Sequence, residues 1–136
     1  MSYTPAEVSF LIEHHEEIAH LDLTLTKASR LKDTEVLKEK FGDYGRAVME
    51  LVTARSSGKL PSDWLMDADS AQQATPVEVA AYRAAFLAEQ GVGSVHDITC
   101  SIGTEGLNSP LDYFGSDLDE SRVRLSLIHI SEPTRL

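Results

Sequence analysis

The stretch VHDITCSIGTEG, residues 95–106, restricts the possible folds of this chain more than any other feature of the sequence. Apolar residues lead to an acid, Asp97, then to a turn of small residues and to a second acid, Glu105. A strand, a tight turn and a helix start, in this order, form a ligand-binding edge in α/β folds. We therefore expect a sheet to open here.

Most of the chain before this stretch has the spacing of helices. TPAE (residues 4–7) is a helix start with a capping box, in which Thr4 is the N-cap. The next helix is predicted over residues 33–40 with Val36 and Leu37 facing inward, and Asp43 is expected to cap a third helix that ends near residue 56. Residues 57–64, SGKLPSDW, contain Gly and Pro and are predicted to be a loop.

A last helix and two strands complete the expected order. TPVE (residues 75–78) repeats the capping pattern, and the helix behind it should present Val79, Phe86 and Leu87 before it stops at Gly91. Short strands are expected at 95–99 and 113–117. The fold class is thus α/β: a helical N-terminal region over residues 1–70, then the start of a Rossmann-like sheet over residues 71–124.

Charge and composition limit the possible partners and surroundings. The net charge of −10 argues that this chain does not itself grip a nucleic-acid backbone. It has no apolar run long enough for a membrane span and no secretory signal, so no membrane association is expected. A single cysteine, Cys100, excludes an internal disulfide framework and suits the reducing cytoplasm.

Three other candidate sites have simpler interpretations. His15 and His20 are five residues apart and point in different directions on a helix, and the Glu17–His20 pair lacks a second pair, so no metal site is expected. Cys100 could act as a nucleophile with His96 as its base, but a buried thiol beneath the turn is the interpretation we favour. Trp64 is either a stacking platform or, as we favour, a plug between the helices and the sheet.

The two strand ends together predict a nucleoside cofactor. An acid after the second strand, Asp117, is placed to accept hydrogen bonds from ribose hydroxyls, whereas Asp119 is better explained as the N-cap of the next helix. Dinucleotide loops need several glycines so that a pyrophosphate can approach the backbone. Here Thr99 and Ser101 stand where glycines are expected, and Gly103 remains. This favours S-adenosylmethionine over NAD, because S-adenosylmethionine has no phosphate and hydroxyl groups can hydrogen-bond to it.

The sequence resembles actinobacterial class I S-adenosylmethionine-dependent methyltransferases that carry a THUMP-like domain. The resemblance rests on KFGDYGRAVMELVTAR, KLPSDWLMDADSAQQATPVEVAAYRAAF, VHDITCSIGTE and FGSDLDESRVRL, and it covers about residues 4–124. It implies a helical N-terminal part, a Rossmann-like methyltransferase domain and a C-terminal THUMP-like region. It also implies RNA as the substrate class, bound by other parts of the protein. The alternatives are a methyltransferase of small molecules or proteins, and a non-catalytic helical interaction module.

The resemblance assigns cofactor-binding residues but no catalytic residue. Asp97, Thr99, Ser101 and Gly103 match the methionine side of the loop, and Asp117 matches the ribose-binding acid. Thr75 is a weaker match to the pocket wall. The first crossover, GLNSPLD, is shorter than is usual in the family, so its helix is expected to be stunted. The catalytic motif after the fourth strand is not in this sequence, and the chain alone is expected to be inactive.

The final residues, LSLIHISEPTRL (125–136), resemble the translation of a sequencing-library adapter. The match runs from Leu125 through Arg135. The helix pattern that begins near Asp119 also stops at RVRL without a cap. We therefore interpret residues 125–136 as an adapter-derived tail on a truncated protein; the alternative is a short natural strand and tail.

Overall fold

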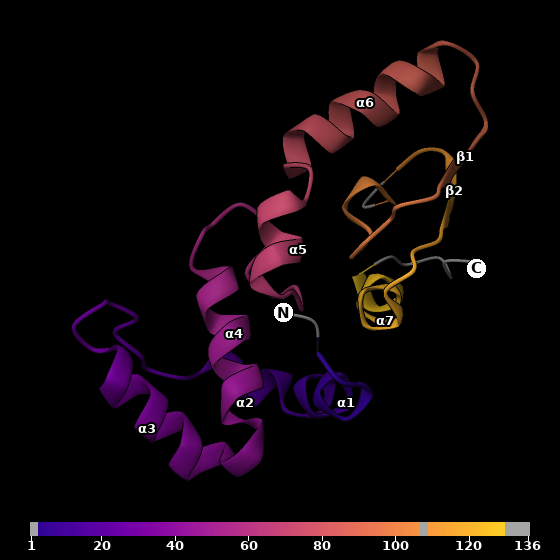
Figure 1. Cartoon of the computed structure of the whole chain (residues 1–136). Helices are drawn as coiled ribbons and strands as arrows, with labels where there is room; N and C mark the ends of the chain where they lie inside the picture. The colour runs from indigo at the N-terminus through magenta and orange to yellow at the C-terminus, as the bar shows by residue number, and fades with distance from the viewer. Residues whose placement is uncertain (1–2, 107–108, 130–136) are drawn as a thin grey trace.

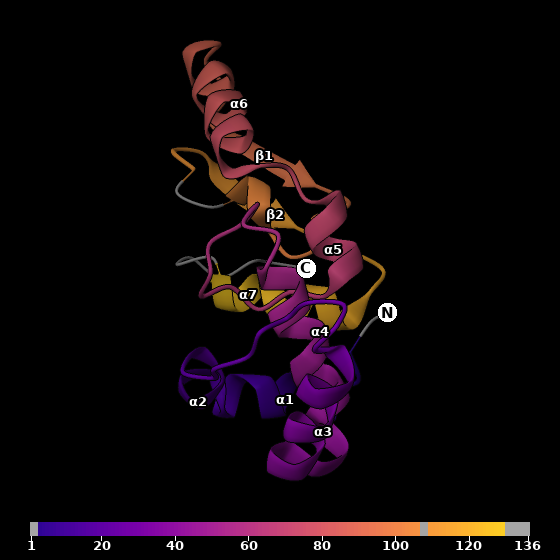
Figure 2. The same ribbon diagram turned by 90° about the vertical axis from the view of Figure 1, so that its left-hand side faces the viewer.

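A computed structural model describes residues 3–106 and 109–129, with side chains placed up to residue 126. Helices come first and a small parallel sheet follows them (Figure 1). In two perpendicular views, α6 and the sheet lie at one end of the molecule and α3 lies at the other (Figure 2). The elements are α1 Pro5–Glu13, α2 His15–Ala19, α3 Arg30–Phe41, η1 Gly42–Tyr44, α4 Gly45–Arg55, α5 Ala68–Gln73, α6 Val77–Glu89, β1 Ser94–Asp97, η2 Thr104–Gly106, β2 Asp112–Gly115 and α7 Glu120–His129.

The capping box predicted at the start of the chain is confirmed. The Thr4 side chain accepts the Glu7 N–H at 3.2 Å, and the Glu7 carboxylate accepts the Thr4 N–H at 2.9 Å. Glu7 also pairs with Arg46 of α4 at 2.6 Å. Since capping satisfies amides that have no partner within the helix, α1 begins at a defined residue and is tied to α4.

The corner between α3 and α4 corrects two predictions. α3 starts at Arg30, earlier than residue 33, and Leu37 is buried as expected, but Val36 is 40% exposed. Asp43 does not cap α4: the N-cap is Tyr44, which makes no side-chain capping bond. The short turn η1 carries the chain directly from one helix into the next, so the backbone has no room for an extended capping residue.

The backbone around Gly45 at this corner leaves little space for a side chain. A Cβ atom on Gly45 would lie 3.0 Å from the Leu37 carbonyl oxygen and 3.1 Å from the Lys38 nitrogen, both backbone atoms. Gly45→Ala is therefore expected to lower the free energy of unfolding by about 1–3 kcal/mol through overpacking. Gly93→Ala is the control, because no atom lies within 4 Å of its Cβ position. Urea denaturation of both variants checks this, and an equal effect at the two sites would contradict it.

The second capping pattern, at Thr75, is wrong as a helix start. α6 begins at Val77 with Pro76 as its N-cap, and no side chain caps it. Its buried residues are Ala80 and Ala84, and the predicted inward residues Val79 and Phe86 are about half exposed. The N-cap of α5 was not predicted: it is Asp67, whose Oδ1 accepts the Ser70 N–H at 2.7 Å.

The predicted helix stop at Gly91 is confirmed. Gly91 has a φ of +82° and its N–H donates to the Ala88 carbonyl, while the Val92 N–H donates to the Leu87 carbonyl. This is the Schellman arrangement, which favours glycine because its backbone adopts positive φ without a Cβ clash. The chain then turns from α6 into β1.

The two strands pair in parallel, with Ser94 beside Asp112 and Asp97 beside Gly115. Each is shorter than predicted at its carboxyl end, where the predicted strands ran to residues 99 and 117. In the described part of the crossover only η2, a single 3-10 turn, is helical, which agrees with the stunted helix expected there; residues 107–108 lie outside the described residues.

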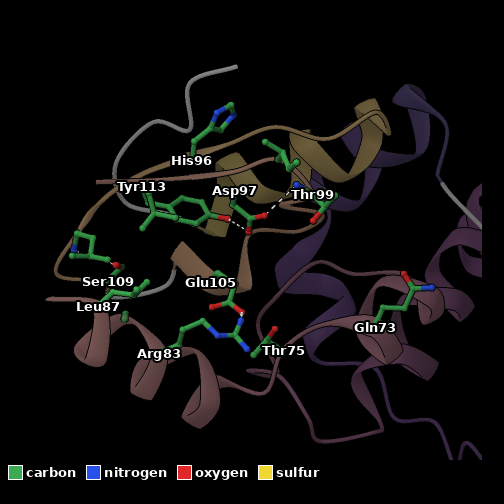
Figure 3. A pocket seen from close by; sticks show the side chains of 14 residues that line it. Gln73, Thr75, Arg83, Leu87, His96, Asp97, Thr99, Glu105, Ser109 and Tyr113 are labelled. Carbon is green, nitrogen blue, oxygen red and sulfur yellow. Dashed lines mark hydrogen bonds and ion pairs between the residues drawn. The ribbon is translucent and has the colours of Figure 1, made fainter. Parts of the chain in front are cut away.

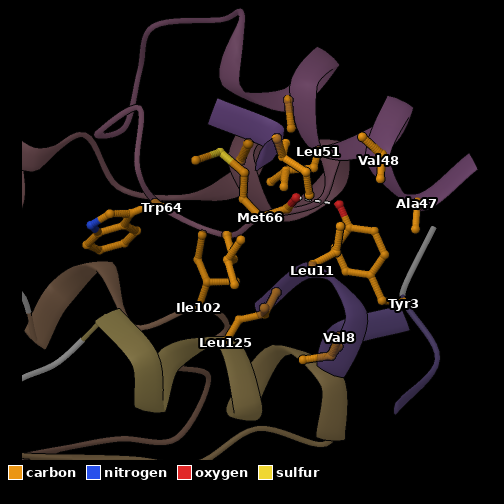
Figure 4. Close-up of a cluster of buried hydrophobic side chains, with 14 of the residues drawn as sticks. Tyr3, Val8, Leu11, Ala47, Val48, Leu51, Trp64, Met66, Ile102 and Leu125 are labelled. Carbon is orange, nitrogen blue, oxygen red and sulfur yellow. Dashed lines mark hydrogen bonds between the residues drawn. The ribbon is translucent and has the colours of Figure 1, made fainter. Parts of the chain in front are cut away.

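One hydrophobic core joins the helices to the loop after β1. Tyr3, Leu11 and Leu51 from the N-terminal part share it with Ile102 and Leu125, which are both fully buried (Figure 4). The Tyr3 hydroxyl donates to the Met66 carbonyl at 2.6 Å. Burial and the nearby Glu50 and Asp67 raise the pKa of this phenol, so it stays protonated. The boundary predicted between residues 70 and 71 stays a prediction, and the core extends across it.

Trp64 and α7 complete this core. Trp64 is 5% exposed and belongs to the core, as expected of a plug. The helix pattern does not stop at Arg124: α7 continues to His129 and buries Leu125 and Ser126. A buried Leu125 does not reveal its origin, because any leucine at this helix position would bury the same surface. The adapter interpretation of residues 125–136 stays a prediction, and residues 130–136 lie outside the described residues.

Candidate functional site

The residues predicted from the two strand ends line one cavity. It has a volume of about 360 Å³ and lies where the loop after β1 meets the segment between β2 and α7. Of the six predicted residues, the five that line it are Thr75, Asp97, Thr99, Ser101 and Asp117. Gly103 lies in the same loop with a φ of +84° but does not line the cavity. Ligands of open parallel sheets bind at this edge of the sheet.

Asp97 organises the first part of the loop. Its Oδ1 accepts the Thr99 N–H at 3.1 Å, and its Oδ2 accepts the Tyr113 hydroxyl of β2 at 2.8 Å. Burial raises the pKa of Tyr113, and the hydrogen bond to Asp97 raises it further. The tyrosine therefore stays a hydrogen-bond donor at neutral pH, and it fixes the orientation of the carboxylate at the end of β1.

Ser101 occupies a conformation that normally belongs to glycine. Its φ is +48°, in the left-handed region that side chains rarely adopt. Its N–H donates to Asp117 Oδ2 at 3.0 Å, which ties the first loop to the segment after β2. Because a serine is held in this strained conformation, the loop has the turn of a glycine-rich loop and adds a hydroxyl to the cavity.

The two acids after β2 have different surroundings, and the predicted N-cap role of Asp119 is confirmed. Asp117 lines the cavity, where its Oδ1 accepts the Asp119 N–H at 2.9 Å. Asp119 caps α7: its Oδ1 accepts the Ser121 N–H at 3.0 Å and the Ser121 hydroxyl at 2.6 Å. A carboxylate has about four lone-pair positions, so Asp117 keeps acceptor capacity beyond its two backbone bonds.

Cys100 is a buried thiol, in agreement with the interpretation favoured above. It is 5% exposed, and burial together with the charges of Asp117 and Asp97 raises its pKa to about 11. His96, the only base proposed for it, instead pairs through Nε2 with the Ser116 hydroxyl at 3.0 Å. At neutral pH the thiol is therefore protonated, which is the less nucleophilic form.

A second cavity of about 500 Å³ adjoins the first (Figure 3). The residues that line both cavities are Gln73, Thr75, Asp97, Thr99 and Glu105. Glu105 forms an ion pair with Arg83 of α6, so this helix is joined to the turn η2.

Arg122 is a charged residue of the first cavity that the sequence did not predict; Gln73, Ala74 and Thr104 also line it without having been predicted. It lies in the first turn of α7 and lines the cavity beside Asp117. The sequence signal was its position three residues after the capping Asp119, which places it on the same side of the helix start.

The histidines of the N-terminal region form no metal centre in the part of the chain that the structure describes. His14 stacks on Phe10 and lies 3.1 Å from Glu17. His15 interacts with the Ile12 carbonyl of α1, and His20 interacts with the Glu16 carbonyl of α2. Within residues 3–106 and 109–129, no group of three or more metal-ligating side chains is gathered in one place. Nor does any helix there have the length and apolarity needed to cross a bilayer.

Fold and site together define an α/β protein with a ligand cavity at the carboxyl ends of two parallel strands. Two proteins of Mycobacterium tuberculosis, from strains CDC 1551 / Oshkosh and ATCC 25618 / H37Rv, are similar to this chain. Both are named as uncharacterized S-adenosylmethionine-dependent methyltransferases. Each is 37% identical over 103 residues, with 66% of this chain and 28% of the relative covered. The chain thus spans 28% of the length of these relatives. No family model matches it, and no solved structure matches it.

Proposed function

We propose that this chain carries the cofactor-binding part of a class I S-adenosylmethionine-dependent methyltransferase. The observation that supports this most is the meeting of Asp97, Ser101 and Asp117 around one cavity at the strand ends. The names of the two mycobacterial relatives point to the same activity. When bound, S-adenosylmethionine would supply an electrophilic methyl group on a sulfonium.

The residues of the cavity fit this cofactor better than a dinucleotide. Asp97, Glu105 and Asp117 all line the cavity, and three carboxylates repel a pyrophosphate. The same carboxylates favour an ammonium, a sulfonium and ribose hydroxyls, which are cations or hydrogen-bond donors. In this proposal Asp117 accepts from the ribose, and the turn from Asp97 to Gly103 holds the methionine end.

The substrate proposal is RNA, and it rests on the resemblance to methyltransferases with a THUMP-like domain. The net charge of −10 means that RNA would be bound by parts of the protein other than this chain. We place the protein in the cytoplasm, a proposal supported by its single, free cysteine. The chain alone is expected not to transfer methyl groups, because a parallel sheet of two strands leaves a substrate pocket unbuilt.

Titration calorimetry on the purified chain tests the cofactor proposal. S-adenosylmethionine is expected to bind saturably with one site, and NAD is expected not to bind. The same preparation, incubated with labelled S-adenosylmethionine and total RNA, is expected to leave the RNA unlabelled. Binding of NAD without binding of S-adenosylmethionine by the folded chain would overturn the cofactor proposal, and labelled RNA would overturn the expected inactivity.

A further inference from the structure

Two buried polar atoms in the proposed cofactor cavity have no hydrogen-bond partner. Among the described residues, the buried side-chain atoms in this state are Asp67 Oδ2, Ser101 Oγ and Arg122 Nε. Ser101 and Arg122 both line the 360 Å³ cavity, together with Asp117. Ser101 Oγ forms no hydrogen bond, and Arg122 Nε has an ion-pair contact with Asp119 but no hydrogen bond. Since buried polar groups are nearly always hydrogen-bonded, these two side chains in one cavity point to a ligand that binds them.

The charged side chains of the cavity restrict the kind of ligand group that Arg122 can bind. Arg122 is the only cationic side chain among the described residues that line this cavity, where Asp97, Glu105 and Asp117 supply negative charge. Its side chain is 19% exposed, and its Nε lies 3.6 Å from Asp119 Oδ2, too far for a hydrogen bond. It also lies in the first turn of α7, where the helix dipole disfavours a cation and favours an anion.

A ligand with several donors and a single anionic group fits this arrangement. A pyrophosphate would bring more negative charge against three carboxylates. A carboxylate brings one charge, and its planar pair of oxygens matches the planar donors of a guanidinium. Of the groups in S-adenosylmethionine, the carboxylate of the amino-acid part is the only anionic one.

We propose that Arg122 binds this carboxylate, with the Ser101 hydroxyl as a second donor. The inference rests on the cofactor proposal above and adds the residue that selects the amino-acid end of the cofactor. In this proposal the start of α7 has two roles. Asp119 caps the helix, and Arg122 in its first turn binds the ligand.

Titration calorimetry with two ligands tests the assignment. Arg122→Met is expected to weaken binding of S-adenosylmethionine about 10-fold or more, because a hydrogen bond to a charged group is lost. Binding of decarboxylated S-adenosylmethionine, which has no carboxylate, should change less than about 2-fold. Arg122→Lys keeps the charge but loses the planar donors, so it should lie between wild type and Arg122→Met.

Arg124→Met is the matched control on the same helix. Arg124 donates to the Pro5 carbonyl and the Ser9 hydroxyl of α1 and does not line the cavity, so its replacement should leave both affinities unchanged. A melting curve for each variant confirms folding; if Arg122→Met does not fold, the ratio of the two affinities in Arg122→Lys decides. Equal loss for both ligands would overturn the carboxylate assignment alone. Failure of the folded wild-type chain to bind either ligand would overturn the cofactor proposal, and this assignment with it.

Discussion

Asp117→Ala is expected to weaken S-adenosylmethionine binding about 10- to 100-fold, since hydrogen bonds to a charged acceptor contribute about 1.5–3 kcal/mol each. The carboxylate lines the cavity and retains acceptor capacity toward ribose hydroxyls. It also holds the Ser101 N–H, so part of the loss could come from the loop. Two further ligands separate these effects: S-adenosylhomocysteine and an analogue of it without ribose hydroxyls. If Asp117 binds the ribose, Asp117→Ala should weaken binding of the analogue far less than binding of S-adenosylhomocysteine itself. Calorimetry on both ligands measures this.

Asp119→Ala is the contrasting variant, two residues away. It removes the N-cap of α7 and is expected to cost about 1 kcal/mol of stability, with a smaller effect on cofactor affinity than Asp117→Ala. Melting curves and calorimetry on the two variants give the comparison. Normal binding by Asp117→Ala together with lost binding by Asp119→Ala would show that the site assignment is wrong by two residues.

Ile102→Ala is expected to lower the free energy of unfolding by about 2–5 kcal/mol, as for other large-to-small changes in a core. The side chain is fully buried and belongs to the same cluster as residues of α1 and α4. Ile98→Ala is the matched control in the same loop, because Ile98 is 71% exposed, and it should change stability by less than about 0.5 kcal/mol. Chemical denaturation followed by circular dichroism measures both. A larger cost at Ile98 would contradict the placement of the loop.

Two similar capping patterns show how far local sequence signals reach. TPAE caps α1 through Thr4, whereas TPVE does not cap α6, although both offer the same Thr and Glu spacing. Between α5 and α6 the chain has only a short extended link, and Thr75 lies in the wall of the cavities there. A capping pattern describes what a residue can do, and the neighbouring helices decide whether it has the space to do so.

Helical periodicity predicted where the apolar residues fall but not which of them are covered. Val36, Val79 and Phe86 follow the expected spacing and are still about half exposed, because contact depends on which elements pack nearby. The site was more predictable, since an acid that ends a parallel strand must lie at the sheet edge whatever the helices do. No such rule predicts the position of Arg122, because its place in the cavity depends on how α7 is oriented relative to β2.

Ser101 and Ile102 are neighbours in the chain, but Ser101 lines the proposed cofactor cavity whereas Ile102 is buried in the core with residues of the N-terminal helices. A protein engineer could not graft this loop onto a foreign sheet by copying the residues from Asp97 to Gly103 alone. The graft would also need an apolar environment for Ile102. In this protein, that environment is a core to which distant residues such as Tyr3 contribute. For the same reason, a genetic screen for lost cofactor binding should also recover substitutions in helices that lie far from the cofactor.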